Sequence, residues 1–119
     1  MWGDGLQTRS FCYIDDCLEG IHRLMHSDFA EPLNVGQDRR IAINDLAHLV
    51  ARIAGIEIQL KHVPGPMGVR GRNSDNSRLR RVLAWEPSIS LEEGFARTYP
   101  WIESQVRASR SELAMSAKA

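Results

Sequence analysis

Two arginines, each following a stretch that contains glycine, could together bind a phosphorylated ligand. Arg72 lies in a loop over residues 65–76, just before a predicted helix start, and Arg9 follows a turn that contains Gly3 and Gly5. A guanidinium presents its N–H donors as a planar fork that matches the oxygens of a phosphate group. Because two such groups could clamp a diphosphate between them, the sequence predicts an anion site and favours a nucleotide as its ligand.

The sequence contains no glycine-rich turn of the kind that binds a dinucleotide. Such a turn connects a strand to a helix and places the pyrophosphate at the helix N-terminus. We therefore interpret the chain as the ligand-holding part of something larger, with no cofactor bound by this chain alone.

Composition is typical of one soluble globular domain. The chain has 119 residues, 43% of them hydrophobic and 25% charged, and its fifteen basic and fifteen acidic residues cancel. The balance predicts no general attraction to nucleic acid or to a membrane surface. No apolar run approaches the roughly 20 residues of a membrane span, and no signal-like N-terminus is evident, so we expect a cytoplasmic protein. We expect residues 1–107 to fold and residues 108–119 to form a disordered tail.

The cysteines and histidines indicate neither a disulfide nor a metal site. Cys12 and Cys17 are predicted to be reduced, partly buried thiols, because the chain shows no export signal. His22 and His26 have the spacing that brings two imidazoles together on a helix, but no third ligand has a suitable spacing. We therefore expect these histidines to be surface residues and predict no metal site.

Apolar and turn-forming residues alternate along the chain in a pattern typical of an α/β fold, with mixed α+β possible. About four helices are expected, and short strands with parallel pairing between them. The pattern predicts strands over residues 10–14, 32–36 and 56–63, and helices from Asp15 or Asp16 to His26, from Asn44 to Gly55, from Asp75 or Asn76 to Leu83, and after Ser90. Pro100 predicts a kink or a restart of the last helix near Tyr99.

Taken in order, these motifs resemble the C-terminal portion of the extended short-chain dehydrogenase/reductase family. The segments that carry the resemblance are Trp2-Gly3-Asp4-Gly5-Leu6-Gln7-Thr8-Arg9-Ser10-Phe11, Tyr13-Ile14-Asp15-Asp16-Cys17 and Pro32-Leu33-Asn34-Val35-Gly36. More narrowly, the loop from His62 to Asn76 is similar to that of the GDP-mannose 3,5-epimerase family. The resemblance runs from Trp2 to about Gln105 and is most specific in this loop.

The resemblance implies substrate-binding roles for Gln7, Thr8, Arg9 and Arg72, with GDP-mannose or a related nucleotide-sugar as the ligand. Family members use tightly bound NAD to oxidise the sugar transiently, and their Rossmann cofactor domain and their catalytic residues precede this region. We therefore expect no catalytic and no cofactor-binding residue in this chain. The isolated chain is predicted to be catalytically incomplete and not to bind NAD productively.

The resemblance also predicts association with another polypeptide. In the family, the segment around Leu33-Asn34-Val35-Gly36 adds to the sheet of the cofactor domain, so the edge of this strand would be exposed here. A homodimer, or a Rossmann domain as partner, would cover that edge together with the apolar helix faces.

Three alternatives stay open at the level of sequence. Arg9 could form a solvated ion pair with Asp15 or Asp16, which would contribute little energy. The chain could be a non-enzymatic module for nucleotide-sugar binding or assembly. It could also bind nucleic acid through the basic cluster Arg70, Arg72, Arg78, Arg80 and Arg81, although its neutral balance and the absence of stacking aromatics within the cluster argue against this.

Overall fold

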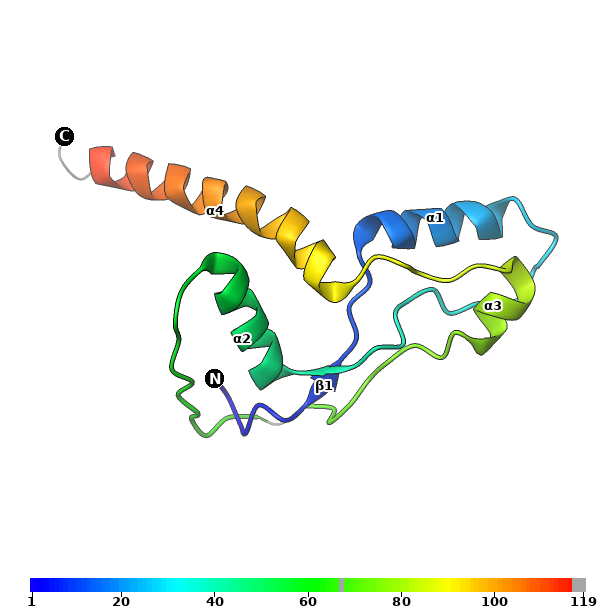
Figure 1. Ribbon diagram of the computed structural model, residues 1–119, viewed down its shortest axis with the longest axis horizontal. Coiled ribbons are helices and arrows are strands. Elements are labelled where there is room, and N and C mark those ends of the chain that lie inside the picture. The colour runs from blue at the N-terminus through cyan, green and yellow to red at the C-terminus, as the bar shows by residue number, and fades with distance from the viewer. Residues whose placement is uncertain (67, 117–119) are drawn as a thin grey trace.

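A computed structural model of the chain describes residues 1–66 and 68–116 (Figure 1). Its elements, in order, are β1 (Thr8–Arg9), α1 (Ile14–Met25), β2 (Ile41–Ala42), α2 (Ile43–Ala54), α3 (Ser77–Leu83) and α4 (Leu91–Ser116). The mixed α/β class and the number of helices expected from the sequence are confirmed. Within the described residues, none of the helices combines the length and the apolar character that a membrane crossing requires.

The helix ends follow the local signals of the sequence closely. Gly55 ends α2 in a left-handed conformation, with φ of 67°, which glycine adopts at low cost. The Ser90 hydroxyl accepts a hydrogen bond from the Glu93 N–H (3.2 Å) at the start of α4. Helix α1 begins at Ile14, slightly earlier than expected, so Asp15 and Asp16 occupy its first turn instead of its cap. Carboxylates are favourable there because the N-terminus of a helix carries partial positive charge.

The expected strands form only in part. Strands β1 and β2 pair antiparallel, with Thr8 opposite Ala42 and Arg9 opposite Ile41. Residues 10–14 and 32–36 form no strand, and within 56–63 only Val63 pairs, in a parallel bridge to Trp2. The three strand predictions were wrong in extent because alternation reports which side chains can be buried, whereas a strand also needs a neighbouring backbone to pair with.

The buried core is small. Leu79 of α3 is fully buried, and Leu49 and Ala51 of α2 are 4% and 6% exposed. A second close contact lies at Gly20 of α1, where an added Cβ would come within 2.5 Å of Val35 and 2.9 Å of the Trp85 ring. The glycine therefore lets α1 approach these side chains closely.

One face of α1 carries large apolar side chains that nothing in the described chain covers. The residues on this face are Ile14, Leu18, Ile21 and Met25, which are 57%, 57%, 45% and 76% exposed. These side chains form an apolar stripe along α1. Much of that stripe lies on the surface because Val35 and the segment after α3 contact other positions of the helix, including the buried Asp16 and Gly20.

Helix α4 is continuous through Pro100 and projects from the rest of the molecule (Figure 1). The whole molecule, α4 included, measures 60 × 34 × 25 Å. Of the kink or restart expected near Tyr99, the continuity of α4 excludes the restart, and the kink stays a prediction. Trp101 of α4 is 66% exposed. Helix α4 extends to Ser116, within the stretch of residues 108–119 that was expected to form a tail, and residues 117–119 lie outside the described residues.

Both cysteines are free and partly buried, as predicted. Burial, followed by the nearby Cys17 and Asp16, raises the pKa of the Cys12 thiol to about 11. A thiol with a raised pKa is a poor nucleophile at neutral pH because little of it is thiolate. The Cys12 thiol is therefore a poor candidate for a nucleophile.

Candidate functional site

Backbone pairing brings the two predicted arginine segments side by side. The Thr8 N–H donates to the carbonyl of Arg70 (2.9 Å), and the Arg72 N–H donates to the carbonyl of Thr8 (3.2 Å), which makes a parallel bridge between Thr8 and Gly71. The Arg9 guanidinium donates to the same Thr8 carbonyl (2.7 Å). The Arg9 side chain and the Arg72 backbone thus converge on one atom.

The register of this bridge places Arg9 and Arg72 on the same face. A Cβ added at Gly71 would lie 2.9 Å from the Thr8 hydroxyl oxygen, so Thr8 and position 71 project to one side. Side chains alternate along extended segments, and paired positions of parallel strands share a face. Arg9 and Arg72 therefore project to the opposite side.

The same alternation separates the four predicted site residues into two sets. Gln7 shares the face of Arg9 and Arg72, whereas Thr8 projects away from it. The Thr8 backbone nonetheless fixes the spacing of the two arginines through both of its hydrogen bonds. Gly71 allows this pairing, because a larger residue would press on the Thr8 hydroxyl.

The arginines of the site differ in their charge partners. Arg70 binds both carboxylate oxygens of Asp4 (3.0 and 2.8 Å). The Leu6 N–H first and the Arg70 guanidinium next lower the pKa of the Asp4 carboxyl, which keeps it ionised. Within residues 1–66 and 68–116, no ion pair is formed by Arg9 or by Arg72. Two neighbouring guanidiniums without a carboxylate favour an added anion.

The alternative in which Arg9 pairs with an aspartate of α1 is wrong. Asp15 lies beside Arg97 (3.5 Å), and the Asp16 carboxylate accepts a hydrogen bond from the Ile89 N–H (2.8 Å). Asp16 is only 5% exposed and ties α1 to the segment before α4. Both carboxylates are therefore engaged with residues other than Arg9.

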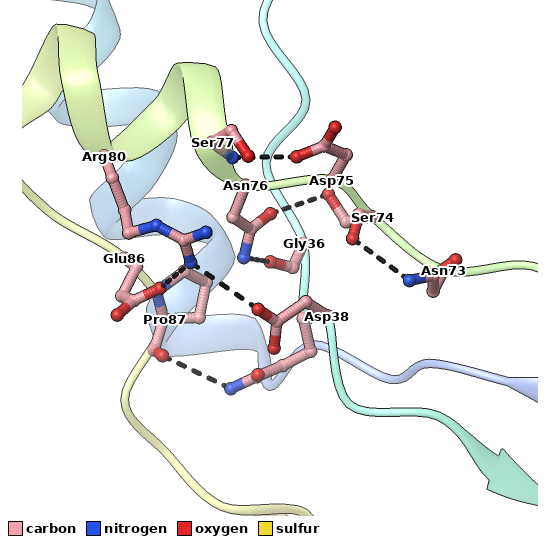
Figure 2. Close-up of polar contacts among 11 residues, drawn as sticks. Gly36, Asp38, Asn73, Ser74, Asp75, Asn76, Ser77, Arg80, Glu86 and Pro87 are labelled. Atoms are coloured by element: carbon pink, nitrogen blue, oxygen red, sulfur yellow. Dashed lines mark hydrogen bonds and ion pairs between the residues drawn. The ribbon is translucent and has the colours of Figure 1, made fainter.

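A buried amide anchors the loop that carries Arg72, as Figure 2 shows. Asn76 is 2% exposed, and its side-chain N–H donates to the carbonyl of Gly36 (2.7 Å) while its oxygen accepts from the Ser74 hydroxyl (2.7 Å). The Asp75 carboxylate accepts from the Ser77 N–H (2.9 Å) at the start of α3. Sequence reasoning identified Asn76 only as a possible helix cap and missed this long-range contact.

Asn44 performs a similar task on the other side of the site. Its amide N–H donates to the Asp4 carbonyl (3.0 Å), and its oxygen accepts from the His62 ring N–H (2.9 Å). Gly5, at a φ of 69°, packs directly against this amide. The helix was expected to begin at Asn44, but α2 begins at Ile43, with Ala42 at the cap position. The Asn44 side chain instead joins the turn before β1 to His62, at the start of the loop of residues 62–76.

The basic cluster that could serve nucleic acid is largely neutralised. Arg78 pairs with Glu31 and donates to the Pro32 carbonyl (3.2 Å). Arg80 pairs with Glu86 (2.6 Å) and Asp38 (3.5 Å), as Figure 2 also shows. A row of guanidiniums already bound to carboxylates is a poor phosphate-binding strip.

Two solved structures that resemble this chain are nucleotide-sugar epimerases. UDP-glucose 4-epimerase of Thermotoga maritima, solved with UDP-glucose, aligns with a TM-score of 0.82 and 30% identity over 89% of this chain and 35% of its own. UDP-glucuronic acid 4-epimerase of Bacillus cereus, solved with UDP-glucuronic acid and NAD, aligns with a TM-score of 0.79 and 28% identity over 88% of this chain and 35% of its own. In fold and in sequence, the chain is similar to the C-terminal portion of the extended short-chain dehydrogenase/reductases.

Sequence comparison narrows this class. GDP-mannose 3,5-epimerase of Arabidopsis thaliana is 48% identical over 111 residues, which are 93% of this chain and 29% of that enzyme. The resemblance to this epimerase inferred from the loop of residues 62–76 is confirmed. The chain spans about 30% of the length of the curated relatives that it matches. No family model matches the chain.

Proposed function

We propose that this chain is the nucleotide-sugar binding portion of an NAD-dependent sugar epimerase, with GDP-mannose or a related nucleotide-sugar as its ligand. One observation supports this most strongly: Arg9 and Arg72 share a face, lie on paired backbone, and form no ion pair within the described residues. The names of the relatives agree with a sugar bound to a nucleoside diphosphate. The two guanidiniums would bind the diphosphate, and Gln7 would bind the adjoining part of the ligand.

We propose that the oxidising cofactor is bound by other parts of the full-length protein. The B. cereus relative was solved with NAD, whereas these 119 residues carry no glycine-rich turn to hold its pyrophosphate. The residues present do not fit the cofactor, so the roles of this chain are to bind and orient the sugar nucleotide. On this proposal the chain is catalytically incomplete by itself.

Calorimetry of the 119-residue chain with GDP-mannose, GDP and NAD tests whether it binds the sugar nucleotide and not the cofactor. We expect GDP-mannose and GDP to bind and NAD not to bind, because the arginine pair recognises a diphosphate without needing the dinucleotide turn. A duplex DNA of random sequence serves as a further ligand. Failure of both GDP ligands to bind would contradict the proposal, as would binding of NAD or DNA more tightly than GDP.

We further propose that the chain forms a homodimer or associates with a Rossmann domain, and that it functions in the cytoplasm. Support comes from the apolar face of α1, which is too large to stay in water without cost, and from two free thiols, which suit a reducing compartment. Light scattering at micromolar chain concentrations should give a mass above that of the monomer. A strictly monomeric mass over that range would contradict self-association.

A further inference from the structure

We propose that Asp4 is a specificity-determining residue of the site, because it occupies the Arg70 guanidinium and so limits the positive charge offered to the ligand to that of Arg9 and Arg72. A site of this charge favours a diphosphate capped by a sugar over a free nucleoside diphosphate. This inference rests on the proposed function and deepens it, because it states which class of diphosphate the same site selects.

Arg70 lies beside the two arginines that form no ion pair within the described residues. Arg70 and Arg72 are two positions apart on one segment, so their side chains project to the same face, about 7 Å apart along the strand. Arg9 projects to that face as well, because the bridge between Thr8 and Gly71 sets it opposite Arg72. A third guanidinium therefore lies within reach of the proposed diphosphate site.

A small cavity supports this placement of Arg70. Gln7, which shares the face of Arg9 and Arg72, lines a cavity of about 20 Å³ together with Arg70. That volume suits a single water molecule, so the two side chains lie close to each other. The Arg70 side chain is also 57% exposed. An anion on this face would meet its guanidinium if no carboxylate had bound it first.

The Asp4 carboxylate is held in place to bind Arg70. One guanidinium nitrogen of Arg70, Nη1, lies 3.0 and 2.8 Å from the two carboxylate oxygens. The same carboxylate accepts a hydrogen bond from the Leu6 N–H (2.9 Å), and the Asp4 carbonyl accepts one from the Asn44 amide (3.0 Å). The turn and the start of α2 therefore orient the carboxylate, and Arg70 is neutralised without a ligand.

Sugar-capped and free nucleoside diphosphates differ in charge. Each phosphate of a nucleotide-sugar is a diester with a single negative charge, whereas a terminal phosphate carries roughly 1.5–2 negative charges at pH 7, as other phosphate monoesters do. Two guanidiniums match a ligand with one charge on each phosphate. A third guanidinium adds affinity mainly for the free diphosphate, because it gives the extra charge a partner. Asp4 removes that advantage, and specificity is a difference of affinities.

Calorimetry of the full 119-residue chain with GDP and GDP-mannose tests this role. Both ligands carry the same base and ribose, so the ratio of their affinities reports on the end that the sugar caps. Asp4→Asn removes the charge but keeps an oxygen that can accept from the Leu6 N–H. The released Arg70 should then raise the affinity for GDP relative to GDP-mannose by about fivefold, the upper range for an exposed charge pair.

Arg70→Gln makes the opposite change. It leaves the Asp4 carboxylate without its arginine beside the site, so both ligands should bind more weakly, and GDP should lose more because its charge is larger. The double variant Asp4→Asn/Arg70→Gln has the original net charge, and its affinity ratio should return to that of the unaltered chain. A purely structural role predicts no such return, because two losses of structure do not cancel.

Glu19→Gln is the matched control. It removes the carboxylate from the ion pair between Arg23 and Glu19 (2.7 Å), which is about as exposed as the pair of Asp4 and Arg70 but lies on α1. Its affinity ratio should equal that of the unaltered chain. The effect of Asp4→Asn should also shrink when the ionic strength rises from about 0.05 to about 0.5 M, since salt screens exposed charges.

The outcomes separate this inference from the proposed function. An unchanged ratio in Asp4→Asn, with both ligands bound normally, would overturn the role of Asp4 and leave the arginine site intact. Equal losses for both ligands in Asp4→Asn, Arg70→Gln and the double variant would also overturn it, since Asp4 would then be a structural residue. Failure of the unaltered chain to bind either ligand would overturn the proposed function and this inference with it.

Discussion

Replacing both Arg9 and Arg72 with alanine should lower the affinity for GDP-mannose by about a hundredfold or more. Hydrogen bonds to charged groups contribute roughly 1.5–3 kcal/mol each, so the loss of two guanidiniums corresponds to at least two powers of ten in Kd. The loss should not depend on unfolding, since neither side chain forms an ion pair within the described residues. Calorimetry with GDP-mannose, together with a thermal melt of each variant, measures both effects.

Two substitutions make this result specific. Arg81→Ala removes an exposed guanidinium of α3 that likewise forms no ion pair among the described residues, and it should leave the affinity unchanged. Arg72→Lys keeps the charge but loses the planar fork, so it should fall between the alanine variant and the unaltered chain. An unchanged affinity in the double alanine variant would show that the two arginines do not face the ligand.

Replacing Leu79 with alanine should destabilise the chain by about 2–5 kcal/mol, the range for removing a fully buried leucine. Leu79 is the largest fully buried side chain of the described residues, and the core around it contains few others. A loss of this size approaches the whole stability of a small domain, which is often only about 5–15 kcal/mol. Urea unfolding followed by circular dichroism gives the change in the free energy of unfolding.

Leu18→Ala is the natural comparison because it makes the same chemical change on the exposed face of α1. In an isolated chain, a leucine that is 57% exposed should contribute less than about 0.5 kcal/mol to the free energy of unfolding. A loss comparable to that of Leu79→Ala, together with a lower molecular mass, would show that a second polypeptide covers this face. A Leu79→Ala variant of unchanged stability would contradict the description of the core.

Much of the local structure could be predicted because it depends on neighbours in sequence. Gly55 ends α2, and Ser90 caps α4, because both effects act within one helical turn. At Pro100 the expected restart does not occur, since the side chain and the missing N–H disfavour a helix only locally and α4 continues through this residue. The strands were overpredicted because a pairing partner is a property of the whole fold.

The candidate site divides in the same way. The residue types of Arg9 and Arg72 and the glycines around them predicted a phosphate site, since the guanidinium fork and the permissive backbone are properties of the residues themselves. Only the tertiary structure decided that these two arginines lie on one face, that Thr8 faces away from them, and that Asp4 engages Arg70. Register and charge partners join residues that are far apart in the chain, and no local pattern specifies them.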